Sequence, residues 1–295
     1  MQDSCGKRPD AAFPLARALV ADVSACGLHA QKAARLRSAL PFRARKRSLP
    51  AGELRATLPL AMCGRFFLSK SGAEIARHFD LSDEPVLAPR FNIAPSQSIP
   101  VVRAEARLGD QRILELRTWG FVPRFAKDLR AGRHPINARA ETVATSPLFR
   151  SAFAGRRGLV PASGFYEWQH RGRSARPFAL QVRGGELFAM AALFDRCEAE
   201  EGVLDSCAIV TTEANERVAI VHDRMPAILA PADYALWLDP SVSEPERLLP
   251  LLRPCPADWI EAHPVERRVN DVRCDDPQLI EPERDWFALG QGEAT

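Results

Sequence analysis

The sequence predicts an α+β fold: one β-rich domain of mostly antiparallel strands, barrel-like or built of packed sheets, with short peripheral helices. Three observations predict it. Residues 62–295 contain short apolar runs that are divided by turn residues. Segments with helical patterning are few and short. The composition, with 46% hydrophobic residues in a chain of 295, supports a large core.

The predicted strands are apolar runs bounded by glycine, proline or polar residues. They are residues 99–103, 112–119, 158–162, 164–168, 177–183, 186–194 and 206–212. The pair Gly184-Gly185 predicts a tight hairpin between the two strands that flank it.

The predicted helices are marked by capping signals. Ser71 and Glu74 form a capping-box pattern that opens a helix to about residue 79. Ser146-Pro147 opens another to about residue 153. Residues 232–238 and 245–252 are expected to be later helices, and the tail after about residue 283 is expected to fray.

The first 61 residues differ from the rest in composition and charge. They hold 11 Lys/Arg and 4 Asp/Glu, a net +7, whereas residues 62–295 hold 29 and 33, a net −4. This leader is expected to be disordered. It is either a targeting or nucleic-acid-binding arm or a stretch translated from a misassigned start codon. Residues 62–295 are taken as one domain, which would need a local groove of arginines to bind a polyanion.

The cysteines argue against a disulfide framework or a metal site. The chain has seven, and the five after the leader include no close pair of the kind that zinc sites use. We therefore expect no metal or organic cofactor, and most thiols to be small buried groups in a reducing cytoplasm. The longest apolar runs are shorter than the roughly 18 residues of a membrane span.

Reactive or anion-binding side chains cluster in five segments rich in glycine, proline and aromatic residues. These are MCGRF (62–66), FNIAP (91–95), INARAET (136–142), GFYEW (164–168) and HDRMP (222–226). In the fourth, aromatic neighbours should partly desolvate Glu167 and raise its pKa toward the range useful for proton transfer. In the last, His222 is of the residue type that titrates near neutral pH.

Together these segments resemble the SRAP family, the SOS response-associated peptidase proteins that crosslink to abasic sites in DNA. Residues 119–128, 209–215 and 267–282 carry further matching text, so the resemblance spans essentially all of 62–282. Family members begin Met-Cys-Gly-Arg, lose the methionine and react through the cysteine, which implies that Cys63 is the reactive residue.

An N-terminal cysteine has a chemistry that an internal one lacks. Its amine (pKa roughly 7.7–8.0) and its thiol (roughly 8.5) are both partly available at neutral pH. The amine forms a Schiff base with the aldehyde of a ring-opened abasic sugar, and the thiolate then closes a thiazolidine. Here 61 residues precede Met62 and acylate that nitrogen, so either translation starts at Met62 or the Met62–Cys63 bond is cut.

The resemblance assigns roles to three further residues. Glu167 would be the general acid/base, and His222 would protonate the sugar ring oxygen or steer the imine. Asn137 would hold the amine or an oxyanion beside the cysteine. The alternatives are an outward carboxylate on a strand, a structural histidine and a turn-capping asparagine.

The expected DNA contacts are cationic and aromatic. Arginines within the five segments would clamp phosphates, a basic loop before Asn137 would guide single-stranded backbone, and aromatic rings would stack on bases. The arginines are Arg65, Arg139 and Arg224; the loop is Lys127, Arg130, Arg133 and His134; the rings are Trp119, Phe125 and Trp168. Phe125 stands where the family usually has tryptophan, which weakens the stacking expectation there.

The sequence therefore predicts a protein that captures abasic sites in single-stranded DNA on Cys63 and shields them. It is expected to act as a monomer in the cytoplasm, associated with the nucleoid when bound to damaged DNA. One rival prediction is a cysteine-type peptidase that acts on other proteins with Cys63, His222 and Glu167. Another is a noncovalent nucleic-acid-binding module.

Overall fold

Two β-sheets form the framework of the described structure, a computed structural model that describes residues 63–105, 111–129, 132, 134–172 and 174–284. The predictions for the leader, for Arg130 and Arg133, and for the end of the tail fall outside these residues. Among the described helices, none is long and apolar enough to cross a membrane.

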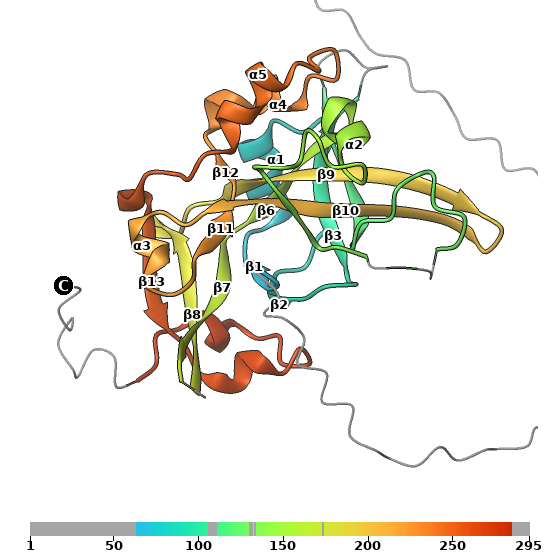
Figure 1. Cartoon of the computed structure of the whole chain (residues 1–295). Helices are drawn as coiled ribbons and strands as arrows, with labels where there is room; N and C mark the ends of the chain where they lie inside the picture. Colours follow the sequence, from blue (N-terminus) through green and yellow to red (C-terminus); the bar gives the residue numbers. More distant parts are fainter. Residues whose placement is uncertain (1–62, 106–110, 130–131, 133, 173, 285–295) are drawn as a thin grey trace, which may run out of the picture. The chain divides into compact units, whose positions relative to one another are not determined.

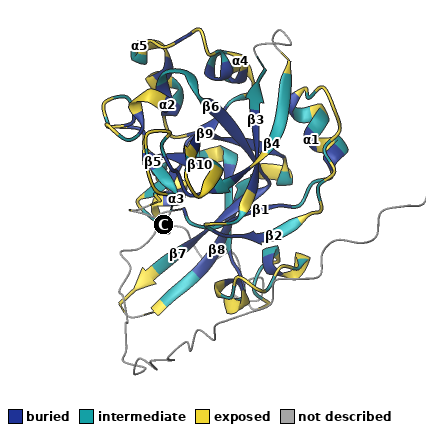
Figure 2. Ribbon diagram, turned by 90° about the vertical axis from the view of Figure 1, so that its right-hand side faces the viewer, coloured by how far each residue is buried: buried dark blue, intermediate teal, exposed yellow. Residues whose placement is uncertain are grey.

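The first sheet has five strands, each antiparallel to its neighbours. Its order is β13 (Ile260–Pro264), β8 (Ser174–Val182), β7 (Gly164–Arg171), β1 (Phe66–Leu68) and β2 (Arg90–Ile93). The long pair β7–β8 projects from the rest of the protein, and its far end is exposed (Figures 1 and 2).

The second sheet closes on itself. Each strand of the ring pairs with the next, and the last pairs with the first. The ring consists of β10 (Gly202–Glu213), β4 (Arg112–Trp119), β3 (Ser98–Ala104), β6 (Arg157–Ala162) and β9 (Phe188–Ala199). Shorter strands extend it: β5 (Asn137–Arg139) and β11 (Arg224–Pro226) pair with β10, and β12 (Ile228–Leu229) pairs with β9.

Short helices surround the sheets. They are α1 (Gly72–Phe79), α2 (Arg150–Gly155), α3 (Glu216–Ala219), α4 (Tyr234–Leu238) and α5 (Pro245–Leu248). The Ser71–Glu74 capping box of α1 is present, with both reciprocal hydrogen bonds. Buried Arg157 ties β6 to this layer, because its guanidinium donates to the carbonyl oxygens of Phe153 and Trp237 at 2.6 and 2.7 Å. The predicted β-rich α+β fold is confirmed.

The core lies inside the closed sheet and between the two sheets, where the strands are buried (Figure 2). Trp119, Phe66 and Phe165 are among its fully covered side chains. The rings of Phe66 and Trp119 pack in a T-shaped arrangement with centroids 5.4 Å apart, which joins β1 of one sheet to β4 of the other. The strand that follows Cys63 is thus anchored in the core.

Two local predictions were wrong. Gly184-Gly185 makes no hairpin, because β8 and β9 belong to different sheets; the two glycines, with φ of 80° and 66°, turn the chain from one sheet to the other. The second helix begins at Arg150, since Pro147 to Phe149 form turns ahead of it.

Candidate active site

Strand register brings Cys63 to Glu167. Phe66 pairs with Phe165 and Phe67 with Gly164, and the Tyr166 N–H donates to the Arg65 carbonyl at 2.9 Å. Continuing this antiparallel register past the start of β1 brings residue 63 alongside the 167–168 stretch of β7. The Cys63 backbone N–H donates to Glu167 Oε1 at 2.6 Å.

Burial dominates the electrostatics of this pair. Cys63 is 3% exposed and Glu167 2%. Desolvation raises the pKa of Glu167, and the nearby His222 opposes that rise. Desolvation, followed by the charge of Glu167 and a side-chain hydrogen bond to it, raises the pKa of the Cys63 thiol well above its ordinary value. One carboxyl group thus contacts both the nitrogen and the sulfur of Cys63.

The segment at β11 forms the other wall. The Cys63 thiol lies 3.9 Å from the Arg224 carbonyl oxygen, and the Arg224 N–H donates to His222 Nδ1 at 3.0 Å. The ring is nearly buried, with its side chain 10% exposed. Because Nδ1 accepts a hydrogen bond, the proton of the neutral ring resides on Nε2. Cys63, Glu167 and His222, distant in sequence, therefore meet in one place.

Asn137 lies on β5 of the second sheet. Its backbone pairs with Ile209 of β10, and its side chain is partly buried. Arg224 of β11 pairs with Glu213 of the same strand, so Asn137 and the His222 segment lie on opposite edges of β10. The predicted contact of Asn137 with the amine of Cys63 stays a prediction.

The arginines predicted to bind phosphate differ in how free they are. Arg139 is exposed. Arg65 donates to Asn92 Oδ1 and to the Val269 carbonyl, both at 2.7 Å, and lies 5.7 Å from the ring centre of Trp168. Arg224 forms a two-bonded ion pair with Glu141, at 2.6 and 3.0 Å. Of the three, Arg139 is the one that faces solvent most openly.

The prediction that Trp119 stacks on exposed bases was wrong. Trp119 is fully buried, and its indole N–H donates to the Ile136 carbonyl at 2.9 Å, so its ring serves the core. Phe125 is 63% exposed, and Trp168 is half-buried with its indole N–H on Asn270 Oδ1. Lys127 is exposed. The latter three remain able to meet a nucleic acid.

Sequence reasoning missed Glu141, the partner of Arg224. The sequence did hold one signal: Glu141 lies in the INARAET segment, two residues after Arg139. An acidic residue beside groups expected to bind phosphate would repel the phosphate unless an arginine pairs with it. The other cysteines behave as expected in most cases: Cys197, Cys207 and Cys255 are buried, while Cys274 is partly exposed.

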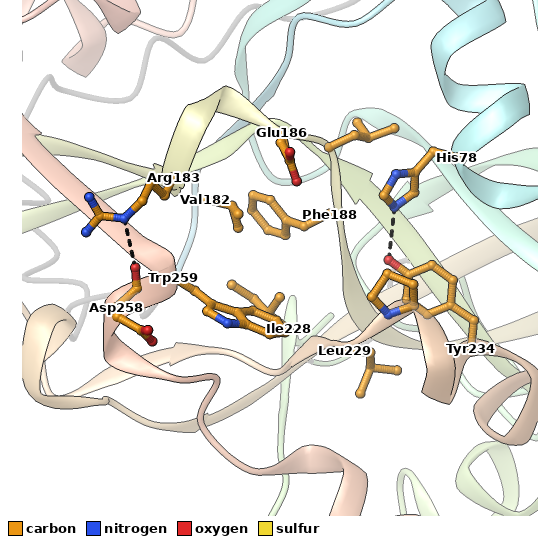
Figure 3. A pocket seen from close by; sticks show the side chains of 12 residues that line it. His78, Val182, Arg183, Glu186, Phe188, Ile228, Leu229, Tyr234, Asp258 and Trp259 are labelled. Carbon is orange, nitrogen blue, oxygen red and sulfur yellow. Dashed lines mark hydrogen bonds between the residues drawn. The ribbon is translucent and has the colours of Figure 1, made fainter.

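A cavity of about 620 Å³ lies elsewhere, between α1, β12, α4 and the turn after β8 (Figure 3). Phe188, Ile228 and Trp259 contribute apolar side chains, and His78 and Tyr234 are joined by a hydrogen bond at 3.1 Å. Its lining includes none of the predicted catalytic residues, so we do not assign the chemistry of Cys63 to it.

The profile of the family described as SOS response associated peptidase (SRAP) matches residues 62–272. Abasic site processing protein YoqW of Bacillus subtilis is 37% identical over 225 residues, which cover 75% of this chain and 99% of YoqW. YedK of Escherichia coli, also named an abasic site processing protein, is 30% identical and covered completely, again by 75% of this chain. HMCES of Gallus gallus, of the same description, is 31% identical, with 75% of this chain and 78% of HMCES covered.

A solved structure supports the fold. A protein from Bacteroides thetaiotaomicron superposes with a TM-score of 0.67 at 22% sequence identity, covering 75% of this chain and all of the other.

Proposed function

Because the chain belongs to the SOS response associated peptidase family, we propose that it captures abasic sites in single-stranded DNA covalently on Cys63. The relatives named abasic site processing proteins support the substrate. The observation that carries the chemistry is the 2.6 Å contact between the Cys63 nitrogen and Glu167, because it sets an acid/base on the atom that must attack the aldehyde.

The reaction runs in two steps. The free amine of Cys63 adds to the aldehyde carbon of the ring-opened sugar, and loss of water gives an imine. The thiol then adds its sulfur to the imine carbon while its proton passes to the nitrogen, closing a thiazolidine. Since burial raises the pKa of the thiol, the amine attacks first and the sulfur follows once Glu167 can take its proton.

The nitrogen must first be released from the Met62 carbonyl. Either translation starts at Met62 and the methionine is removed, or the chain cuts itself. In self-cleavage the Cys63 sulfur attacks the Met62 carbonyl carbon, Glu167 transfers the thiol proton to the departing nitrogen, and water hydrolyses the thioester. Cys63 has a φ of +42°, a left-handed value that costs roughly 1–2 kcal/mol in a non-glycine residue. That strain ends with the cut, which favours cleavage.

The surrounding groups support capture in distinct ways. The Nε2 proton of His222 is suited to donation to the sugar ring oxygen as the ring opens. Asn137 would orient the amine without adding charge. Arg139 and Lys127 would contact phosphates, and Phe125 would stack on a base. The protein would act as a monomer in the cytoplasm, on nucleoid DNA.

The decisive experiment uses protein that begins at Cys63 and an oligonucleotide with one abasic site, single-stranded or in a duplex. We expect an adduct on a denaturing gel, stronger with the single strand, whose mass is that of protein plus DNA minus one water. The matched control is the same protein with the Cys63 nitrogen acetylated, which should form none. Cys63→Ser retains the amine, so it should yield a stable adduct only after borohydride reduces the imine.

The same experiment separates the rivals. Equal adduct from the acetylated protein would refute the proposal. Cleavage of unrelated peptides without any DNA adduct would favour a cysteine-type peptidase. DNA retention under native conditions alone would favour a noncovalent binding module.

A further inference from the structure

Arg224 connects two of the reacting groups through its own peptide units. Its N–H donates to His222 Nδ1 at 3.0 Å, and its carbonyl oxygen lies 3.9 Å from the Cys63 sulfur. The Asp223 carboxylate also lies 3.0 Å from Nδ1, where it would accept a hydrogen bond from an Nδ1–H ring, but its side chain is 87% exposed, so water competes for that contact. A small shift of the Arg224 backbone would therefore disturb both the histidine tautomer and the surroundings of the thiol.

The side chain of the same arginine is fixed by Glu141. The guanidinium donates to both carboxylate oxygens, at 2.6 and 3.0 Å, and to the Thr211 carbonyl at 2.8 Å. Only 11% of the Arg224 side chain is exposed, against 43% for Glu141, so the arginine is the enclosed partner. The hydrogen bond from Arg224 lowers the pKa of Glu141, which keeps the carboxylate charged at neutral pH.

The ion pair also spans a strand. Thr211 of β10 pairs with Arg139 of β5 on one side and with Pro226 of β11 on the other. Glu141 lies just after β5 and Arg224 at the start of β11. Their contact ties the strand of Asn137 to the segment that carries His222, across the end of β10.

From this geometry we infer that Glu141 is a positioning residue: its ion pair anchors Arg224 so that the arginine's peptide units hold His222 and face Cys63. The inference rests on the proposed capture reaction. In this arrangement the Arg224 guanidinium is held by Glu141 and Thr211, whereas Arg139 is exposed to solvent.

The test compares Glu141→Gln with wild type in protein that begins at Cys63. We expect a roughly tenfold slower single-turnover crosslinking rate, equivalent to about 1.4 kcal/mol of the barrier. The Kd for DNA that carries tetrahydrofuran, an abasic analogue without an aldehyde, should stay within about twofold. Glu141→Asp should recover part of the rate. Glu283→Gln is the matched control, because Glu283 is similarly exposed at 40% and pairs with Arg176 at 2.7 Å; its rate should equal that of wild type.

A second readout does not depend on crosslinking. Nitrogen-15 NMR of the His222 ring should report the Nε2–H form in wild type and a mixture of tautomers in Glu141→Gln. If wild type fails to crosslink while this difference is seen, the capture proposal fails and the positioning role stands. Should Glu141→Gln not fold, Glu141→Asp carries both measurements.

Two results would overturn the inference. One is a Glu141→Gln protein with the wild-type rate and an unchanged His222 tautomer. The other is tighter binding of the tetrahydrofuran DNA with a steeper salt dependence, because Glu141 would then be masking a phosphate-binding arginine.

Discussion

A single buried carboxyl group, that of Glu167, interacts with several reactive atoms around Cys63. Glu167 accepts a hydrogen bond from the nitrogen, contacts the sulfur and lies near His222. Its burial favours the protonated form, which suits transfer of a proton to and from a nucleophile near neutral pH. The same burial means that the charged form of Glu167 destabilises the folded state.

This desolvation cost predicts that Glu167→Gln increases the stability of the fold, and that the increase depends on pH. Since the folded state raises the pKa of Glu167, stability is lost as pH rises from the ordinary carboxyl range through the folded-state pKa. Glutamine escapes this loss while keeping an oxygen for the Cys63 N–H. We expect its Tm to exceed that of wild type at pH 8 by a few degrees, at about 2–4 °C per kcal/mol, with crosslinking nearly abolished.

Calorimetry at pH 5 and pH 8 on protein whose Cys63 nitrogen is acetylated, so that no ammonium group lies beside Glu167, checks this prediction. The Tm difference between Glu167→Gln and wild type should shrink at pH 5, where the wild-type carboxyl is protonated in the fold. A variant less stable than wild type at pH 8 would show that the carboxylate stabilises the site after all.

At the scale of elements, the sequence predicted strands whose apolar runs are long. The β4 bounds agree with prediction, and β9 and β10 are longer than expected because their polar far ends pair with each other. Strands β1, β2, β5 and β11 have only three or four residues each, which is too short for an alternating apolar pattern to be recognised in the sequence. Their residues were noticed through chemistry instead.

The sequence predicted which residues belong to the site better than it predicted how they contact one another. Resemblance named Cys63, Glu167 and His222, but Cys63 and Glu167 are separated by 104 positions, and only strand pairing shows which atoms meet. Trp119 and the Gly184-Gly185 turn were misassigned for a common reason: a local pattern cannot tell which sheet or which side of the core a residue faces. Glu141 stands in a segment that was singled out, but its pairing with Arg224, 83 positions away, could not be predicted from the local pattern.

Gly164 is packed so closely by neighbouring strands that we expect a larger side chain there to disturb the fold beside the site. A Cβ there would lie 2.1 Å from Phe67 Cζ and 2.8 Å from the Leu180 carbonyl oxygen, which β7–β8 pairing holds in place. Gly164→Ala should therefore displace β1, destabilise the fold by at least about 1–3 kcal/mol and slow crosslinking, because β1 leads directly from Cys63.

Urea denaturation and single-turnover crosslinking test this displacement. The matched control is Gly155→Ala, whose added Cβ would come no closer than 4.0 Å to the Pro240 carbonyl oxygen. That change should stabilise the fold slightly, by up to about 1 kcal/mol, because Gly155 ends α2 and alanine lowers the entropy of the unfolded chain. If Gly164→Ala behaved like its control, β1 would be free to move without harm to the site.

At the scale of the whole molecule, charge is divided unevenly along the chain. Residues 62–295 carry a net −4 and the first 61 a net +7. Within the site, the Arg224 guanidinium is engaged by Glu141, and Arg65 by Asn92 and Val269. Attraction to DNA from the domain alone should thus be weak, and specificity should come mainly from the covalent step.

This division predicts different salt dependences for two forms of the protein. Each phosphate contact to single-stranded DNA adds about −0.7 to the slope of log Kobs against log salt concentration. With two or three contacts, protein that begins at Cys63 should give a slope of about −1.5 to −2 on tetrahydrofuran DNA. The full chain should be steeper, because the leader adds a net +7. Fluorescence anisotropy from low to moderate salt measures both. Equal slopes would mean that the leader does not contact DNA, and a steep slope for the shorter form would mean that arginines now paired inside the site exchange their partners for phosphates.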